Sequence, residues 1–290
     1  MWALVAPAVL ALSACSDEAQ GEWSRIAMPE GASDRSEHII DFWQWTWLAA
    51  ILVGILTWGL ILYAAFKFRR RSDDEVPVQT RYNLPMEILY TIAPVIVVLV
   101  FFKFVIDTQN EVDAASDQPD HVVKVVGQQW SWTFNYVDDP ALGGSSEQDV
   151  CEDQTDAESA TCVYNVGTPA EVPTMYLPVD ETVRFELVSP DVVHSFWVPA
   201  FNYKLDVIPG RENAFEITPT REGTFVGRCA ELCGTYHSRM LFNVEIVSAE
   251  EYEQHLRDLA DAGNVGIALG GSEAITQDGL DAEEETEAGE

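Results

Sequence analysis

One short stretch of the chain, RCAELCGTYHSRM at residues 228–240, brings together Cys229, Cys233, His237 and Met240. The spacing is Cys-x3-Cys-x3-His-x2-Met, which differs from the Cys-x2-Cys of common structural zinc sites. A methionine thioether is a poor zinc ligand but suits copper, and sites of His, Cys and a weak Met transfer electrons. A mononuclear blue copper site uses one cysteine, whereas two thiolates can bridge two copper ions. The stretch therefore predicts a copper electron-transfer site.

A copper pair needs a second histidine ligand. The chain has 5 histidines: His38, His121, His194, His237 and His255. His194 begins HSFWVP, which has the pattern of a strand, and in Greek-key cupredoxin folds an early-strand histidine meets a late ligand loop. We therefore expect His194 to be the second histidine ligand. His38 precedes the first apolar stretch and His255 lies on an expected C-terminal helix, so we expect both to be solvated surface residues.

Two stretches, residues 42–66 and residues 86–106, are apolar and long enough to cross a bilayer, which takes about 20 residues. Tryptophans at the start of the first stretch fit an interfacial aromatic belt. The loop between the stretches holds a group of basic residues: Lys67, Arg69, Arg70, Arg71 and Arg81. Because positive loops stay cytoplasmic, we expect a transmembrane hairpin over residues 39–106 in the cell membrane, with both termini outside the cytoplasm. Two buried core helices are the alternative, which the length and the charge contrast disfavour.

Residues 1–14, MWALVAPAVLALSA, form an apolar run that ends in small residues, which is typical of a secretory signal. The sequence LSAC, ending at Cys15, resembles the bacterial lipobox, in which the cysteine becomes the lipidated N-terminus after cleavage. We expect a signal peptide over residues 1–14, lipidation of Cys15 and an extracytoplasmic segment over residues 15–38. A chance cysteine after an ordinary signal is the alternative, and the usual basic n-region is missing.

From about residue 107, short alternating runs separated by Pro, Gly and Asn predict an antiparallel β-sandwich or barrel over residues 107–262. Ser248 and Glu251 form a capping box before a short acidic helix. Residues 263–290 are polar and end in acidic residues, so we expect a disordered tail. Besides HSFWVP, the expected strands cover residues 121–127, 130–136, 182–188, 213–218, 223–229 and 240–247.

A polar, acidic segment over residues 138–169 interrupts the strands and holds Cys151 and Cys162. In an exported domain, an even number of cysteines within a loop favours a disulfide, so we expect these two to pair. We also expect this insertion to touch a partner protein rather than the core.

The chain is strongly acidic, with a formal net charge of -32 from 48 acidic and 16 basic residues. Such a surface repels a phosphate backbone, so we exclude nucleic acid as a partner. Solubility, a salt-rich habitat and steering of a basic partner remain open as reasons for the acidity.

The sequences SPDVVHSFWVPAFNYKLDVIPGR and GTFVGRCAELCGTYHSRM resemble subunit II of the haem–copper cytochrome c oxidases, which holds the dinuclear copper site CuA. The likeness covers residues 39–262 and implies a two-helix transmembrane hairpin followed by a cupredoxin-like Greek-key domain. It also implies that Cys229 and Cys233 bridge the two coppers and that His194 and His237 each bind one.

Further roles follow from the same resemblance. Met240 is expected as a weak ligand of one copper. Glu231 is expected to offer its backbone carbonyl to the other copper and its side chain to a magnesium ion shared with subunit I. Trp130, in VGQQWSWTFNY, is expected to receive the electron, although Gln128 stands where the family often has His. Glu87 matches an acidic residue at the mouth of a proton pathway in subunit I.

The implied function is electron entry into cytochrome c oxidase, from cytochrome c or a membrane-bound c-type cytochrome of the bc complex to haem a in subunit I. Oxygen is then reduced to water, coupled to proton translocation, in the assembled complex with its other subunits. The family has no fixed loop like residues 138–169, and a lipidated start is typical only of some bacterial groups, so these two departures together suggest an actinobacterial member. Asp191, beside the His194 strand, is expected to help dock the cytochrome.

Three alternatives are weighed against this function. A quinol oxidase subunit II lacks the copper ligands that are present here. Nitrous oxide reductase needs a large propeller domain for which the chain has no room. A copper-carrying lipoprotein without enzymatic function would not need two spans.

Overall fold

The computed structural model describes residues 17–146, 151, 160–168 and 170–270. The predicted signal peptide, Cys15, residues 147–150, 152–159 and 169 of the insertion, and residues 271–290 lie outside the described residues. The chain forms two compact units, His38–Val112 and a second unit of Met1–Glu37 with Asp113–Glu290.

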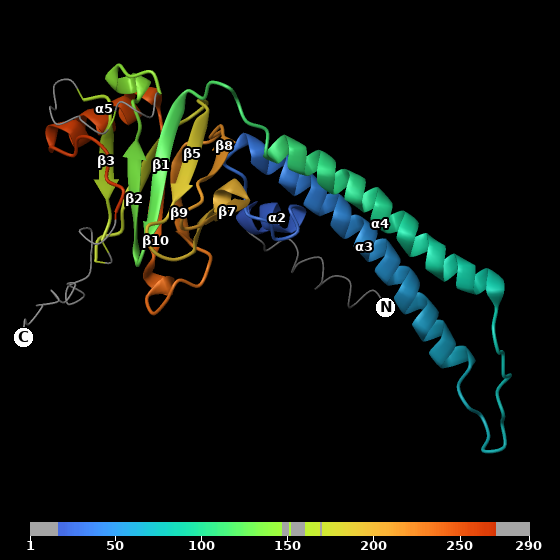
Figure 1. The fold of residues 1–290 in the computed structure, drawn as a ribbon. Coiled ribbons are helices and arrows are strands. Elements are labelled where there is room, and N and C mark those ends of the chain that lie inside the picture. The colour runs from blue at the N-terminus through green and yellow to red at the C-terminus, as the bar shows by residue number, and fades with distance from the viewer. Residues whose placement is uncertain (1–16, 147–150, 152–159, 169, 271–290) are drawn as a thin grey trace, which may run out of the picture. The chain divides into compact units, whose positions relative to one another are not determined.

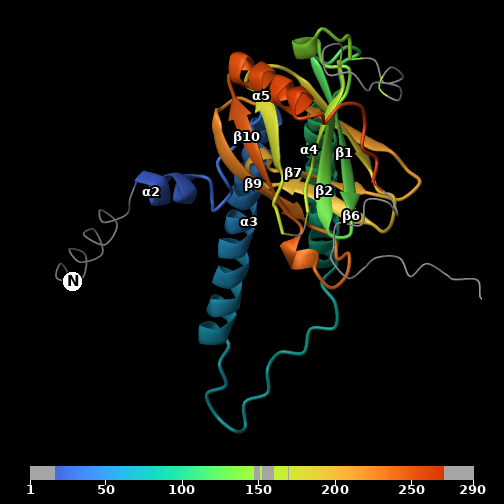
Figure 2. The ribbon, with the colours of Figure 1, turned by 90° about the vertical axis from the view of Figure 1, so that its left-hand side faces the viewer.

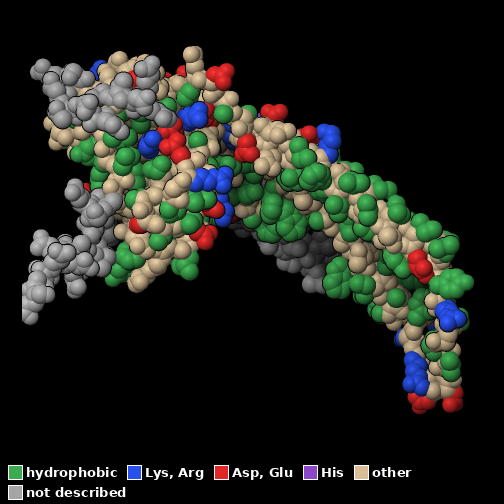
Figure 3. Space-filling model, viewed as in Figure 1, with side chains coloured by type: hydrophobic (Ala, Val, Ile, Leu, Met, Phe, Trp, Pro, Cys, Tyr) green, Lys and Arg blue, Asp and Glu red, His purple; other side chains and the backbone are tan. Residues whose placement is uncertain are grey.

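The unit His38–Val112 consists of the helices α3, Asp34–Lys67, which begins just before it, and α4, Leu84–Val112. Both helices are long and apolar enough to cross a membrane, and the most apolar part of each helix has no buried residue. Hydrophobic side chains cover the visible face of both helices (Figure 3). Because a helix satisfies its own backbone hydrogen bonds, such a surface is suited to lipid or to a membrane-embedded partner. The two predicted spans are therefore helical, and each helix extends beyond the predicted apolar stretch.

The other unit is a sandwich of two five-stranded sheets (Figure 1). Strand order is β3-β2-β1-β5-β8 in the first sheet and β4-β10-β9-β6-β7 in the second. The first sheet contains β1 His121–Gln128, β2 Ser131–Tyr136, β3 Val163–Val166, β5 Val183–Val188 and β8 Asn213–Ile217. The second contains β4 Thr174–Pro178, β6 His194–Val198, β7 Tyr203–Val207, β9 Gly223–Cys229 and β10 Leu241–Val247. The predicted β-sandwich is confirmed, but it is not wholly antiparallel, because β1 pairs with β5 and β4 pairs with β10 in parallel. The strands β3, β4 and β7 were not indicated by the sequence pattern.

The core lies between the two sheets and is rich in aromatic side chains. Side chains alternate across a strand, so Trp132 and Phe134 of β2 face Phe242 of β10, with ring centroids 5.3 and 5.5 Å apart. Phe196 of β6 stacks on the same ring at 4.9 Å. These rings are fully or almost fully buried. Interlocking rings from both sheets hold the sheet ends in a fixed relation, which a site built on those ends requires.

Helix α5, Ala249–Asp261, packs against β3 and β4, the strands that end the two sheets, and so closes one edge of the sandwich (Figure 2). Ser248 caps it by accepting a hydrogen bond from the Glu251 backbone N–H, as the capping pattern predicts. The prediction for His255 is wrong. Its ring stacks on Tyr176 with centroids 3.7 Å apart, and burial lowers its pKa to about 4.

The boundaries expected for the β-domain, residues 107–262, are too narrow. Before α3, Ala32 donates its backbone N–H to the Ala200 carbonyl, and Thr220 donates to the Ala32 carbonyl. Beyond α5, residues 264–268 pair with β2 and β3, so the tail is ordered past the expected boundary at residue 263. A soluble fragment limited to residues 107–262 would lack both sets of contacts.

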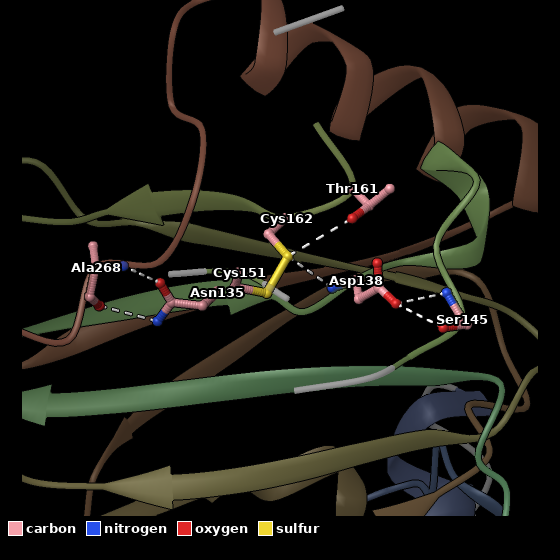
Figure 4. The surroundings of a disulfide bond; sticks show 7 residues. All are labelled: Asn135, Asp138, Ser145, Cys151, Thr161, Cys162 and Ala268. Atoms are coloured by element: carbon pink, nitrogen blue, oxygen red, sulfur yellow. Dashed lines mark hydrogen bonds between the residues drawn. A yellow bond between two sulfur atoms is a disulfide. The ribbon is translucent and has the colours of Figure 1, made fainter. Parts of the chain in front are cut away.

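The expected insertion, residues 138–169, is not all loop, because β3 and the η2 turn, Pro140–Leu142, lie within it. The predicted disulfide is confirmed: Cys151 is bonded to Cys162 just before β3 (Figure 4). Both cysteines are buried with Val122 and Val137 in a second small apolar cluster. The disulfide thus closes a loop within the insertion and packs that loop against the outward face of the first sheet.

We expect the double substitution Cys151→Ser with Cys162→Ser to lower the free energy of unfolding by about 3 kcal/mol, because an unlinked loop gains entropy when the chain unfolds. Thermal unfolding of the full-length protein in detergent, followed by near-ultraviolet circular dichroism, measures the change. The metal centre lies at the other end of the sandwich, so metal content serves as the control and should not change. An unchanged melting temperature would contradict a stabilising disulfide.

A buried ionic cluster joins the start of β1 to the insertion and to α5. His121 Nδ1 lies 2.9 Å from Asp139 Oδ2, and His121 Nε2 lies 2.6 Å from Glu181 Oε2. The Tyr252 hydroxyl donates to the same Asp139 oxygen at 2.7 Å. Burial by itself would lower the pKa of His121, but the two carboxylates outweigh it and raise that pKa above its usual value. The geometry therefore favours a charged imidazolium that donates to both carboxylates.

We expect His121→Asn to lower the melting temperature more near pH 6 than near pH 9. Stabilisation from a raised histidine pKa is fully present below the unfolded value of about 6.5 and is lost as the pH rises through the folded value. Melting temperatures of both proteins across this pH range measure the effect. A difference that is the same at every pH would show that only packing is lost.

Candidate metal centre

The stretch that opened the sequence analysis forms the loop between β9 and β10. Cys229 is the last residue of β9, and its backbone N–H donates to the Met240 carbonyl, which closes the loop at its base. Within the loop, His237 begins the short η5 turn, His237–Arg239, and its backbone N–H donates to the Gly234 carbonyl. The loop lies at the opposite end of the sandwich from α5 (Figures 1 and 2).

His194 reaches this loop through strand pairing. It is the first residue of β6, which pairs with β9 in a register that sets Phe196 opposite Cys229. The Ala230 backbone N–H donates to the Ser195 carbonyl at 3.0 Å, so the pairing continues into the loop. The structure thus brings His194 to the cysteines, as the sequence analysis expected.

The predicted donor atoms converge. Cys229 Sγ lies 3.8 Å from Cys233 Sγ and 3.9 Å from His194 Nδ1. Cys233 Sγ lies 3.6 Å from His237 Nδ1 and 3.8 Å from Met240 Sδ. The Glu231 carbonyl oxygen lies 3.2 Å from Cys229 Sγ. Every predicted donor therefore has a sulfur of the cysteine pair within 4 Å.

The centre is shielded from solvent and its chemistry is soft. His194 and Met240 are fully buried and the two cysteines almost so, and neither cysteine forms a disulfide. The contact between the two thiols lowers the pKa of Cys229 and, together with burial, raises the pKa of Cys233. Two thiol sulfurs so close together cannot both hold a negative charge without a cation between them. Among the described residues, the potential ligand atoms of His194, Cys229 and Cys233 all lie within 4.8 Å of one another, which is close enough to hold a metal ion.

Asp191 orients His194. Its Oδ1 lies 2.9 Å from His194 Nε2, which leaves Nδ1 to face the sulfur of Cys229. Its Oδ2 accepts the Gln129 backbone N–H at 2.7 Å. Burial opposes ionisation of Asp191, but the hydrogen bonds from His194 and from the backbone outweigh it and lower its pKa. The expectation that Asp191 docks a cytochrome stays untested, and its contacts show a second role, since a carboxylate on the outer nitrogen fixes the orientation of a ligating histidine.

Trp130 lies directly on the loop. Its indole Nε1 donates to the Cys233 carbonyl at 3.2 Å, and its ring makes an edge contact with Tyr236. The neighbouring Gln129 side chain donates to the same carbonyl at 2.7 Å. Gly234 makes this contact possible, because it has a φ of +123° and a Cβ there would lie 3.1 Å from both side chains. Trp130 is therefore one hydrogen bond away from the backbone of a predicted bridging cysteine.

Other predicted residues lie away from the centre. The Glu231 side chain is exposed. Glu87 lies in the first turn of α4, where its carboxylate accepts the Asn83 backbone N–H at 2.9 Å. That contact caps a helix, so Glu87 has a structural task whether or not it takes part in proton uptake.

The sequence did not indicate three residues that contact Trp130 or His194. Gln129 and Gly234 hold the Trp130 contact, and Gly127 packs against His194, where a Cβ would lie 3.4 Å from the histidine Cβ and 2.9 Å from Trp132. The Cys-Gly pair at Cys233 was a usable signal for a tight turn. Gly127 in β1 carried no such signal, because the residue that it contacts, His194, lies 67 positions later in the sequence.

Comparison with known proteins decides the family. Residues 121–247 match "Cytochrome C oxidase subunit II, periplasmic domain", and residues 21–105 match "Cytochrome C oxidase subunit II, transmembrane domain". A probable cytochrome c oxidase subunit 2 of Streptomyces coelicolor is 47% identical over 287 residues, covering 93% of this chain and 89% of that protein. The chain belongs to the cytochrome c oxidase subunit II family. The actinobacterial cytochrome c oxidase subunit 2 of Corynebacterium glutamicum is 35% identical and covers 81% of this chain and 76% of its own length.

The crystal structure of the periplasmic domain of subunit II of cytochrome oxidase from Bradyrhizobium japonicum covers 51% of this chain and 99% of its own, with 26% identity and a TM-score of 0.40. Family membership confirms the resemblance stated from the sequence. This subunit II is a membrane protein with two spans and part of an oxidoreductase complex. Its His/Cys/Cys group is consistent with a CuA copper site.

Proposed function

We propose that this subunit II accepts single electrons from a c-type cytochrome through a dinuclear copper site and passes them to haem a of subunit I. The observation that supports this most strongly is the convergence of two histidine nitrogens and a methionine sulfur on the sulfurs of two buried cysteines at the sheet end. Two bridging thiolates with one histidine for each metal match the preference of copper for sulfur and imidazole. Zinc would gain nothing from the methionine.

In this proposal Cys229 and Cys233 hold both copper ions, His194 and His237 each hold one, and Met240 and the Glu231 carbonyl complete the two sets. A thiolate-bridged copper pair would supply one-electron storage with little change in geometry. Two backbone contacts position the ligands. The hydrogen bond from the Cys229 N–H to the Met240 carbonyl holds Met240 at the base of the loop, and pairing of β6 with β9 holds His194 near the cysteines. Trp130 offers an aromatic path from the surface to the Cys233 backbone.

Further parts of the proposal concern the surroundings of the site. The basic loop between the spans favours a topology with the β-domain, and so the copper site, outside the cytoplasm, where c-type cytochromes act. The family resemblance supports a magnesium ion on the Glu231 side chain and a proton-pathway role for Glu87. The lipobox-like sequence supports lipidation of Cys15, and the acidity of the chain supports docking at Asp191. We also propose that the insertion contacts a partner protein.

Isolation of the full-length chain from its native membrane tests the function. We expect it to co-purify with a haem-bearing polytopic subunit, to hold about two copper ions per chain, and to support cytochrome oxidation by the complex. A chain that purifies alone with copper would instead support the copper-carrying lipoprotein. A complex without copper in this subunit would contradict the proposal.

A further inference from the structure

A cavity of about 630 Å³ lies between α3 and α4, which run side by side (Figure 1). Its lining comes from residues 38–49 of α3 and residues 100–111 of α4, so it lies wholly within the unit His38–Val112. These residues straddle the start of the first predicted span at residue 42 and the end of the second at residue 106. The cavity is therefore at a membrane surface, at the end of the hairpin away from the basic loop.

The lining changes in character with depth. Inside the spans it is apolar, with Ala49 of α3 facing Phe101 of α4. Beyond the ends of the spans it is acidic, with Asp41 on α3 and Asp107 and Glu111 on α4. The cavity thus has an apolar part at the depth of hydrocarbon and an acidic mouth at the depth of lipid headgroups.

The charge at the mouth favours a cation. Asp107 forms an ion pair with Lys103 of the next turn, so its charge is already matched. Asp41 and Glu111 add negative charge, and the described lining includes no Lys or Arg. An anionic headgroup would be repelled here. A primary amine can donate charge-assisted hydrogen bonds to carboxylates, whereas a quaternary ammonium has no N–H to donate.

One polar group in the wall has no partner. The hydroxyl of Thr46 is buried and finds no hydrogen-bond partner among the described residues. Thr57, on the same helix, shows the usual arrangement, since its hydroxyl donates to the Val53 carbonyl at 2.8 Å. A buried hydroxyl without an acceptor at this depth costs free energy, because the bilayer core holds no water. The Thr46 hydroxyl therefore indicates an acceptor on a molecule that occupies the cavity.

The order of these groups matches the order of groups along a phospholipid. From the membrane surface inwards, such a lipid presents its headgroup, then its ester carbonyls, then its acyl chains. The cavity presents carboxylates, then the Thr46 hydroxyl, then apolar side chains, and the rise of an α-helix places Thr46 about 7.5 Å deeper than Asp41. A helix of a partner protein fits less well, because its backbone carbonyls are already bonded within the helix.

We propose that the cavity between α3 and α4 binds one phospholipid with a primary-amine headgroup. The amine lies at Asp41 and Glu111, an ester carbonyl accepts the Thr46 hydroxyl, and an acyl chain lies along Ala49 and Phe101. The lipid fills the space between the helices at this end and so stabilises the hairpin. The inference depends on the two spans and is independent of the proposed electron-entry function.

The test uses the assembled complex with the full chain, equilibrated in nanodiscs of equal parts phosphatidylethanolamine, phosphatidylcholine and phosphatidylglycerol. The complex is then transferred to mild detergent, and retained lipids are counted by native mass spectrometry. The variant Asp41→Asn with Glu111→Gln removes the negative charge at the mouth and keeps the side-chain sizes. We expect the native complex to retain about one more phosphatidylethanolamine per chain than this variant, because the cavity has room for a single ligand of that size. Retention of the other two lipids should not differ.

The hydroxyl is tested by Thr46→Val, with Thr57→Val as the matched control. Both variants exchange a hydroxyl for a methyl on α3, but the Thr57 hydroxyl is bonded within its own helix. We expect Thr46→Val to lower the affinity of the site for phosphatidylethanolamine by about three- to tenfold, the effect of one hydrogen bond, and Thr57→Val to leave it unchanged. Titration of the lipid into the delipidated complex, followed by native mass spectrometry, measures the affinity.

Ala49→Phe fills the apolar part of the cavity and provides a second variant that leaves the acidic mouth intact. Added phosphatidylethanolamine should raise the melting temperature of the native complex and not that of Ala49→Phe, while copper content stays the same in both. Equal retention of phosphatidylethanolamine by the native complex and the charge-neutralised variant would overturn the inference. It would also be overturned if phosphatidylcholine or phosphatidylglycerol were retained in its place, or if a partner helix left the cavity without lipid.

Discussion

Substitution of either bridging cysteine, Cys229→Ser or Cys233→Ser, is expected to reduce the copper content from about two ions to about one per chain. A hydroxyl oxygen is a hard, neutral ligand, so the remaining thiolate and one or two imidazoles can hold only a mononuclear site. Electron entry from cytochrome c should then fall to a small fraction of the native rate. Metal analysis and the visible thiolate-to-copper absorption of the purified complex measure the change.

Met240→Leu is the matched control, because it removes only the sulfur that lies 3.8 Å from Cys233 Sγ and keeps the side-chain volume nearly unchanged. Both copper ions should remain, while electron transfer slows. His194→Ala tests the ligand that is distant in the sequence and should cost one copper ion. A native chain that holds one copper ion or prefers zinc would contradict the dinuclear site.

The second large effect is expected at the tryptophan contact. Gly234→Ala places a Cβ 3.1 Å from Trp130 at a backbone conformation that alanine rarely adopts, so the indole must leave the Cys233 carbonyl. We expect electron entry from the cytochrome to slow by at least about tenfold, a barrier increase of about 1.4 kcal/mol. Stopped-flow reduction of the copper absorption by cytochrome c measures this step directly.

Trp130→Leu should slow the same step without straining the loop, which separates loss of the indole from distortion by Gly234→Ala. Copper content should stay at the native value in both variants. Reduction by a small chemical reductant, which does not need the tryptophan, is the internal control and should stay fast. Unchanged stopped-flow rates in Trp130→Leu would place electron entry elsewhere on the surface.

The sequence by itself determined the features that depend on neighbouring residues. The four donors of the metal loop lie within one stretch, so their types and spacing already indicated copper. The apolar length of α3 and α4 predicted two spans, and the strand patterns predicted seven of the strands to within one residue. The disulfide between Cys151 and Cys162 was also predictable from the sequence, because the two cysteines lie in one short loop of a domain that was expected to be exported.

Only the tertiary structure decided the features that depend on strand pairing. Resemblance suggested His194, but the β6–β9 register delivers it to the cysteines. Asp191 looked like a surface charge and proved to orient that histidine, and His255 looked solvated and proved to be stacked on Tyr176. The segment after α5, residues 264–268, was expected to be disordered because its composition is polar. It is ordered because Asn135 and the edge of β3 satisfy its backbone, a contact between distant residues that composition does not encode.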